Sequence, residues 1–171
     1  SADIASRHGK WNSIPYQTAM MDIANTPPKS RIVVFKTSTQ VGKTEIIKNI
    51  VGHRMAYHNG GQALLLPTES FAKEFSKLQL TSLIRDTKIL AEKVPQSRKD
   101  GNSVLVKQWA GGFLRLVGSN KADRLAGFPS SFLAVDELDR CYLVSTNSAG
   151  VVEGNPVEIF LERFKNWPDR L

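Results

Sequence analysis

Apolar residues along the chain alternate between short strand-like runs and longer stretches with helical spacing. Arg31–Phe35 is a β-branched apolar run, which predicts a strand. Lys43–His58 follows it and carries apolar residues three and four positions apart, at Ile46, Ile47, Ile50 and Val51. The pattern therefore predicts a strand, a loop and a helix in succession.

A second strand and a second helical stretch are predicted next. Gly60 and Gly61 are expected to end the first helix, and Ala63–Leu66 is a short apolar run typical of a buried strand. Thr68 is a suitable N-cap residue for the helix that follows. Apolar residues then recur at mostly helical intervals, which predicts a broken helical region over Glu69–Glu92.

A hairpin and a further buried strand are expected in the second half of the chain. Val104–Trp109 and Phe113–Val117 are strand-like and flank the turn sequence Ala110–Gly112, which favours a glycine turn between them. Phe132–Val135 has four consecutive apolar residues and ends at Asp136. This run predicts another buried strand.

The last predicted helix begins at Asn155 and Pro156, which suit the cap and the first turn. Its expected apolar face consists of Val157, Phe160, Phe164 and Trp167. Because strands and helices alternate, we expect a mainly parallel central sheet with helices on both faces, a three-layer α/β fold.

Candidate chemistry lies first in the loop Thr37–Thr44, which matches the pattern G-x-x-x-x-G-K-S/T except that Thr37 replaces the first glycine. A loop between a strand and a helix directs backbone N–H groups at one anion, so phosphate binding is predicted. Lys43 would neutralise the β- and γ-phosphates, Gly42 would allow close approach of the backbone, and Thr44 would help to hold Mg²⁺. The alternative is a Gly-Lys-Thr tripeptide that opens an ordinary helix.

The second candidate is an acidic pair directly after the strand Phe132–Val135. The carboxyl edge of an open α/β sheet is where ligands bind. Asp136 is expected to hold Mg²⁺ through the water shell of the metal, and Glu137 to orient or deprotonate the water that attacks the γ-phosphate. The alternative is a charged, solvated turn over Asp136–Arg140. We interpret Asp139 and Arg140 as structural.

Together the two motifs favour an ASCE-type P-loop NTPase with ATP and Mg²⁺ as cofactors. The 171 residues and 41% hydrophobic content indicate one domain, 1–171, and no apolar run is long enough to span a bilayer. Cys141 is the only cysteine, which excludes an intrachain disulfide and a cysteine-based zinc site. The formal charge of +7 favours a polyanionic partner.

Four passages of this chain resemble the large terminase subunits of tailed bacteriophages and prophages, particularly the lambda-like, gpA-type group and its N-terminal ATPase domain. These passages occur in the order typical of the family. They are Ile14-Pro15-Tyr16-Gln17, Ser38-Thr39-Gln40-Val41-Gly42-Lys43-Thr44-Glu45, the stretch from Gly118-Ser119-Asn120 to Arg124-Leu125-Ala126-Gly127, and Val135-Asp136-Glu137-Leu138-Asp139-Arg140.

The resemblance implies particular roles for residues of these passages. It implies that Gln17 reads adenine, since a carboxamide can both donate to and accept from its edge. Many terminases carry an arginine in the phosphate loop, which is missing here, so Arg124 becomes the candidate arginine that reaches the nucleotide of a neighbouring subunit. A surface or DNA-contacting role is the alternative for Arg124. The implied nucleotide-binding set is Gln17, Ser38, Thr39, Gln40, Val41, Gly42, Lys43, Thr44 and Glu45.

The resemblance also implies a motor that hydrolyses ATP to move double-stranded DNA into a procapsid in the host cytoplasm, without a membrane partner. The implied partners are DNA, the small terminase subunit, the portal and further copies in a ring. The candidate neighbours of the DNA phosphates are Lys36, Lys121, Arg98 and Lys99, and a solvated surface position is the alternative for each. The family's nuclease domain and its coupling motif are not recognisable, so we expect a truncated chain, possible as a monomer, that binds nucleotide but turns it over poorly. Alternatives are a helicase-like DNA-dependent ATPase and a nucleotide-binding assembly module with impaired hydrolysis.

Overall fold

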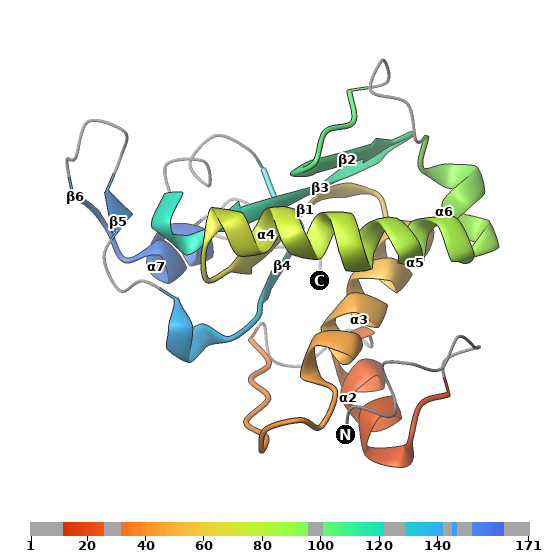
Figure 1. The fold of residues 1–171 in the computed structure, drawn as a ribbon, viewed down its shortest axis with the longest axis horizontal. Coiled ribbons are helices and arrows are strands. Elements are labelled where there is room, and N and C mark those ends of the chain that lie inside the picture. Colours follow the sequence, from red (N-terminus) through yellow and green to blue (C-terminus); the bar gives the residue numbers. More distant parts are fainter. Residues whose placement is uncertain are drawn as a thin grey trace.

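A computed structural model describes residues 12–25, 32–95, 101–121, 129–141, 145–146 and 152–162 of the chain (Figure 1). Its centre is a four-stranded sheet in the order β2-β3-β1-β4. The strands are β1 (Gly60–Leu66), β2 (Val106–Trp109), β3 (Gly112–Gly118) and β4 (Phe132–Val135). A separate two-stranded sheet joins β5 (Ser145–Thr146) to β6 (Val152–Gly154).

Most of the central sheet is parallel. β1 pairs with β3 on one side and with β4 on the other, both in parallel, so that Leu64 lies opposite Leu116 and Ala134. β2 and β3 pair antiparallel and are the two strands of the predicted glycine hairpin. The sheet is therefore mainly parallel, as expected, with one antiparallel pair at its β2 edge. The carboxyl ends of the parallel strands β1, β3 and β4 meet at one edge.

The helices confirm the predicted spacing. They are α2 (Pro15–Asn25), α3 (Lys43–Tyr57), α4 (Glu69–Phe75), α5 (Thr81–Asp86), α6 (Lys88–Lys93) and α7 (Pro156–Glu162). A π-helical turn at Ser76–Leu80 joins α4 to α5, which explains why the apolar spacing over Glu69–Glu92 is broken. In Figure 1, α4 and α5 form one long rod across the face of the sheet.

Side-chain caps start two of these helices as expected. The backbone N–H of Phe71 donates to the Thr68 hydroxyl over 3.2 Å at the start of α4. At α7, the N–H of Val157 donates to Asn155 Oδ1 over 2.9 Å. Within the predicted apolar face of α7, the side chain of Phe160 and the residues Phe164 and Trp167 lie outside the described residues.

The core forms on both faces of the sheet because alternate residues of each strand point to opposite sides. Leu64, Leu66, Leu114 and Leu116 are buried against α3 to α6, with Met55 and Phe75 among their partners. Ala63, Leu65 and Val117 face the other side, where Val157 and Ile159 of α7 pack on them. Burial of each large side chain stabilises the fold by roughly 1.5–3 kcal/mol.

The predicted strand Arg31–Phe35 is wrong for the part that is described. Arg31 lies outside the described residues, and residues 32–38 form no strand. A strand needs a neighbour for its backbone groups, and none of these residues forms a backbone hydrogen bond to a described strand. The side chains of Ile32 and Val34 are accordingly 61% and 75% exposed.

Gly60 and Gly61 do not end a helix but open β1. α3 ends at Tyr57, and the next residue, His58, is extended and donates its N–H to the carbonyl of Arg54 over 2.9 Å. A Cβ atom at Gly61 would lie 2.1 Å from the carbonyl oxygen of Pro129. The second glycine is therefore required by a close backbone approach between β1 and the segment before β4.

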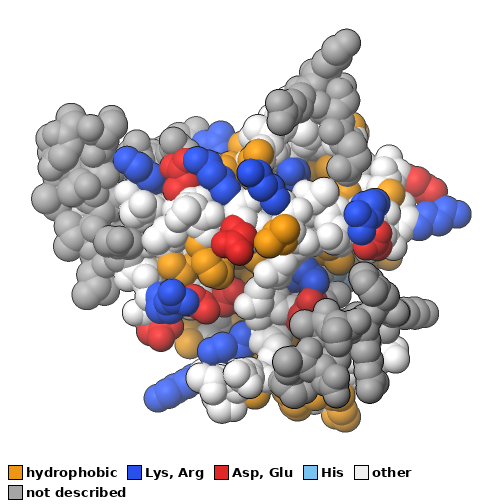
Figure 2. Space-filling model, in the orientation of Figure 1, with side chains coloured by type: hydrophobic (Ala, Val, Ile, Leu, Met, Phe, Trp, Pro, Cys, Tyr) orange, Lys and Arg blue, Asp and Glu red, His pale blue; other side chains and the backbone are white. Residues whose placement is uncertain are grey.

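The described surface mixes charges of both signs. On the face shown in Figure 2, blue basic side chains alternate with red acidic and orange apolar ones. The described basic side chains on this face do not gather into one continuous basic patch. None of the described helices has both the length and the apolar character that a bilayer crossing requires.

Candidate functional site

The 37–44 loop curls back on itself before α3. Its backbone takes left-handed conformations at Gln40, with φ 58°, and at Gly42, with φ 80°. Gly42 is the N-cap residue of α3, and its carbonyl accepts the first helical hydrogen bond from Ile46 N–H over 3.0 Å. Such a curl, ending at a helix N-terminus, is the backbone geometry that gathers N–H groups around an anion.

The backbone N–H groups of residues 39–44 have no protein acceptor among the described residues. The Lys43 ammonium likewise makes neither a hydrogen bond nor an ion pair with a described residue. Buried or half-buried donors are usually satisfied, so this loop concentrates unused N–H groups and one positive charge in a single place.

Helix α2 is hydrogen-bonded to the 37–44 loop. The Tyr16 hydroxyl donates to the carbonyl of Val41 over 2.9 Å, and Gln17 Nε2 donates to the same oxygen over 3.2 Å. Gln17 is 8% exposed, and its Oε1 accepts from Ile14 N–H over 3.1 Å. A Cβ at Gly42 would lie 2.9 Å from Gln17 Nε2, so α2 and the loop touch closely.

The carboxamide of Gln17 retains unused hydrogen-bonding capacity. An amide side chain has two N–H donors and two acceptor lone pairs. Within the described residues it uses one donor on Val41 and one acceptor on Ile14. The structure therefore gives Gln17 a contact with the 37–44 loop that the sequence did not predict, and its adenine-reading role stays a prediction.

The end of β4 meets the start of α3. The Thr44 hydroxyl donates to Asp136 Oδ2 over 3.2 Å, across 92 positions of sequence. Asp136 continues the strand ladder, because its N–H donates to the Leu65 carbonyl over 3.1 Å. Its Oδ1 accepts from the N–H of Glu137 over 2.9 Å. The predicted loop and the predicted acidic pair thus form one site.

Asp136 is 3% exposed, and this burial raises the pKa of its carboxyl group above the ordinary value. The hydrogen bonds from Thr44 and from the Glu137 N–H act in the opposite direction, as does the charge of Lys43, while the charge of Glu137 adds to the rise of the pKa. A buried carboxylate of this kind favours a cation beside it.

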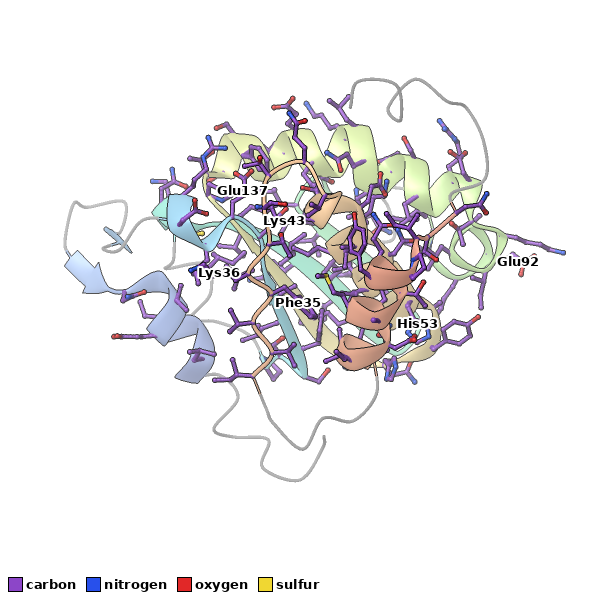
Figure 3. All side chains as sticks on the ribbon, turned by 90° about the horizontal axis from the view of Figure 1, so that it is seen from below. Phe35, Lys36, Lys43, His53, Glu92 and Glu137 are labelled. Atoms are coloured by element: carbon purple, nitrogen blue, oxygen red, sulfur yellow. The ribbon has the colours of Figure 1, made fainter. Side chains whose placement is uncertain are left out.

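Glu137 has an unusual backbone for a residue with a side chain. It is left-handed, with φ 49° and ψ 52°, and precedes a single 3₁₀ turn at Leu138–Arg140. Its Oε2 accepts from Arg140 Nη1 over 2.7 Å. Figure 3 shows Glu137 and Lys43 at the same end of the sheet, whereas His53 and Glu92 lie far from them. Arg140, which we interpreted as structural, thus contacts the predicted water-activating residue.

The ends of β1 and β3 complete this edge of the sheet. The Ser119 hydroxyl donates to the Pro67 carbonyl over 2.7 Å, and Asn120 Oδ1 accepts from the N–H of Glu69 over 3.0 Å. A Cβ at Gly118 would lie 2.1 Å from that same nitrogen. These polar side chains fix the start of α4 next to the site, and no motif pointed to this role.

The other residues predicted for the site either lie outside the described residues or make no described hydrogen bond or ion pair with the acidic pair. Arg124, Arg98 and Lys99 lie outside the described residues, and Lys36 is exposed on the segment before the loop. Thr39 and Gln40 are exposed in the loop, and Glu45 pairs with Lys48 on the first turns of α3. Ser38 is exposed as well.

The donor set at the end of β4 fits Mg²⁺. The described residues contain no group of three or more His, Cys, Asp and Glu side chains able to hold a metal ion. Mg²⁺ suits such a site, because it keeps several waters and takes only one or two protein oxygens together with phosphate. The Thr44 hydroxyl and the Asp136 carboxylate are the two protein oxygens that would hold it.

The fold and the site together define an α/β protein in which a curled glycine loop at a helix start faces a carboxylate pair at one edge of the sheet. Residues 5–171 match the family described as the phage terminase large subunit gpA, ATPase domain. The chain belongs to that family, which confirms the resemblance carried by the four sequence passages.

Two curated relatives are similar to the chain over part of its length. The terminase large subunit of Enterobacteria phage P21 is 24% identical over 107 residues, which is 61% of this chain and 16% of that protein. The terminase large subunit of Escherichia phage lambda is 24% identical over 110 residues, or 63% of this chain and 17% of that protein. The matched region thus spans about a sixth of each relative. No solved structure matches the chain.

Proposed function

We propose that this chain is the ATP-hydrolysing module of a viral DNA-packaging motor, which uses ATP and Mg²⁺ to move double-stranded DNA into a procapsid. The observation that carries this proposal is the hydrogen bond from Thr44 to Asp136, which joins the unused donors of the 37–44 loop to the acidic pair. Membership of the terminase ATPase family supports the same function.

Each residue of the site has a distinct part in this proposal. The free N–H groups of the loop and the Lys43 ammonium bind the β- and γ-phosphates. Thr44 and Asp136 would hold Mg²⁺, and the cation would supply positive charge beside the phosphates. The oxygen of a water molecule attacks the γ-phosphorus, and the bond from that phosphorus to ADP breaks. Glu137 accepts a proton from the attacking water. Gln17 uses its remaining donor and acceptor on the adenine edge.

The proposed partners follow from the family. They are double-stranded DNA, the small terminase subunit, the portal and further copies of the motor in a ring, all in the host cytoplasm. In such a ring Arg124 would reach the γ-phosphate bound to the neighbouring copy, where an arginine typically accelerates hydrolysis by about 10³- to 10⁵-fold.

A second candidate function is a nucleotide-binding assembly module without efficient turnover. It is favoured by Thr37, which stands where the loop pattern has its first glycine. A helicase-like DNA-dependent ATPase is a third candidate, because a glutamine before the loop and an Asp-Glu pair suit both classes. The comparison with terminases favours the packaging motor over the helicase.

Phosphate release measured with and without double-stranded DNA separates these functions. A motor releases phosphate faster with DNA, whereas an assembly module binds nucleotide without DNA-stimulated release. We expect Glu137→Gln to retain ATP affinity and to slow hydrolysis at least about tenfold, because it removes only the proton acceptor. Asp139→Asn, an exposed acidic neighbour, is the matched control and should hydrolyse ATP at the normal rate.

Lys43→Ala tests the binding half of the site. We expect it to weaken ATP binding at least about tenfold in calorimetry, because the phosphates lose a charged donor. Lys36→Ala removes an exposed lysine just before the loop and should leave the affinity unchanged. Normal affinity in Lys43→Ala, or lost affinity in Glu137→Gln, would contradict these assignments.

A further inference from the structure

Arg140 makes two contacts with Glu137, the residue that stands last in the predicted acidic pair. Its guanidinium Nη1 lies 2.7 Å from Glu137 Oε2. Its backbone N–H donates to the carbonyl of Glu137 over 2.8 Å, because Leu138–Arg140 forms a single 3₁₀ turn. The turn therefore folds the arginine side chain back over the carboxylate three residues before it.

Glu137 is tied at three points by its neighbours. Its N–H donates to Asp136 Oδ1 over 2.9 Å, its carbonyl accepts from Arg140, and its side chain is paired with Arg140. Left-handed backbone is unfavourable for a residue with a side chain and persists only where surrounding contacts enforce it. These contacts fix the backbone conformation of Glu137 and so set the direction in which its side chain leaves the edge of the sheet.

The ion pair leaves one carboxylate oxygen available. Oε2 accepts from Arg140, while Oε1 has no donor among the described residues. An oxygen that carries an unused lone pair can accept a hydrogen bond from water. The arginine thus orients the carboxylate without blocking both of its oxygens.

The ion pair between Arg140 and Glu137 is too exposed to contribute much to the stability of the fold. The side chain of Arg140 is 63% exposed and that of Glu137 is 28% exposed. Ion pairs exposed to this extent contribute little to the free energy of folding, because water screens them and their side chains lose freedom. The other side chains of the turn, Leu138 and Asp139, are exposed, and Asp139 has no ion-pair partner among the described residues.

We propose that Arg140 is a positioning residue that holds the Glu137 carboxylate in the direction needed to accept the proton of the attacking water. The inference rests on the proposed ATP hydrolysis and adds a residue to its machinery. In this proposal Arg140 acts through Glu137 and has no direct part in binding the nucleotide. The charge of Lys43 also acts on the acidic pair, since it lowers the pKa of Asp136, and in the proposed site Lys43 is engaged with the phosphates.

The test compares the steady-state ATPase of the full-length protein with DNA for Arg140→Ala, Arg140→Lys and the matched control Asp139→Ala. We expect Arg140→Ala to lower kcat about tenfold or more, with KM for ATP within about twofold, since only orientation of the water-activating group is lost. Arg140→Lys should recover part of kcat, because an ammonium can reach one carboxylate oxygen as a point charge. Asp139→Ala should match the unsubstituted protein.

Three results would overturn the inference: unchanged or raised kcat in Arg140→Ala, a rise in KM that accounts for the loss, or no recovery in Arg140→Lys. Raised kcat would mean that Arg140 restrains Glu137 instead of orienting it. If Arg140→Ala fails to fold, Arg140→Lys alone decides, because normal KM with reduced kcat supports positioning and full activity opposes it. Absence of DNA-stimulated turnover in the unsubstituted protein would instead overturn the proposed function.

Discussion

The hydroxyl of Thr44 on the first turn of α3 donates to Asp136 Oδ2 at the end of β4 over 3.2 Å. Each group limits the freedom of the other, because the carboxylate is buried and the hydroxyl has one described acceptor. The two oxygen-bearing side chains are therefore already held together, as the proposed Mg²⁺ site would require.

Removal of the Thr44 hydroxyl tests this pair. Thr44→Val keeps the shape of the side chain but removes one oxygen ligand and leaves Asp136 Oδ2 without its donor. We expect ATP affinity measured by calorimetry with Mg²⁺ to fall about tenfold, while affinity measured with a chelator changes little. Thr18→Val, on the exposed side of α2, is the matched control. An equal loss with and without Mg²⁺ would remove Thr44 from the metal site.

Gly42→Ala tests the packing of α2 against the loop. The new Cβ would lie 2.9 Å from Gln17 Nε2 at a residue with φ 80°, so we expect a stability loss of about 1–2 kcal/mol and weaker nucleotide binding. Denaturant unfolding measures the first effect. In the Gln17→Ala background the steric part disappears, so Gly42→Ala should cost less there. Additive losses in this double-mutant cycle would show that the contact is unimportant.

Asp136→Asn should raise the melting temperature of the protein in the absence of metal. Burial raises the pKa of Asp136 in the folded state, so ionisation of this group opposes folding, and its cost grows as the pH rises from the unfolded pKa through the folded pKa. The amide that replaces the carboxylate would carry no charge, and Thr44 can rotate its hydroxyl to suit it. Melting curves recorded from neutral pH down to about pH 4 should show the gain at neutral pH and its disappearance in acid.

Asp139→Asn is the control for this pH series, because Asp139 is exposed and its substitution should leave the melting temperature unchanged. With Mg²⁺ and ATP the order should reverse, since only the unsubstituted protein gains stability from bound ligand. A lower melting temperature of Asp136→Asn at neutral pH without metal would mean that the carboxylate is already compensated by protein contacts.

Local patterns in the sequence predicted most of the described fold. Short apolar runs such as Phe132–Val135 were identified correctly because a strand that packs against apolar residues on both faces has few polar positions. The same reasoning failed at Arg31–Phe35. An apolar run shows that a segment suits a sheet, but it does not reveal whether a neighbouring strand is available to pair with it. Ile32 and Val34 are exposed for that reason.

The candidate site was predictable only where a motif spans it. The loop and acidic-pair patterns placed Thr44 and Asp136 together, although 92 positions separate them. The contact between Arg140 and Glu137 depends on a left-handed residue followed by a 3₁₀ turn, and neither leaves a periodic signal. Likewise, Gln17 matched a motif through its chemistry, but its hydrogen bond to Val41 depends on where α2 lies.

Helix α2 is anchored near both ends, at its start to the 37–44 loop and near its end to the last turn of α3. Tyr16 and Gln17 share the carbonyl of Val41, and near the other end Arg54 Nη2 of α3 donates to the carbonyl of Ala24 over 3.2 Å. A shift of the loop on nucleotide binding would therefore act directly on the start of α2, while the Arg54 contact would hold its other end. Amide hydrogen exchange in α2 would then report whether a nucleotide occupies the 37–44 loop.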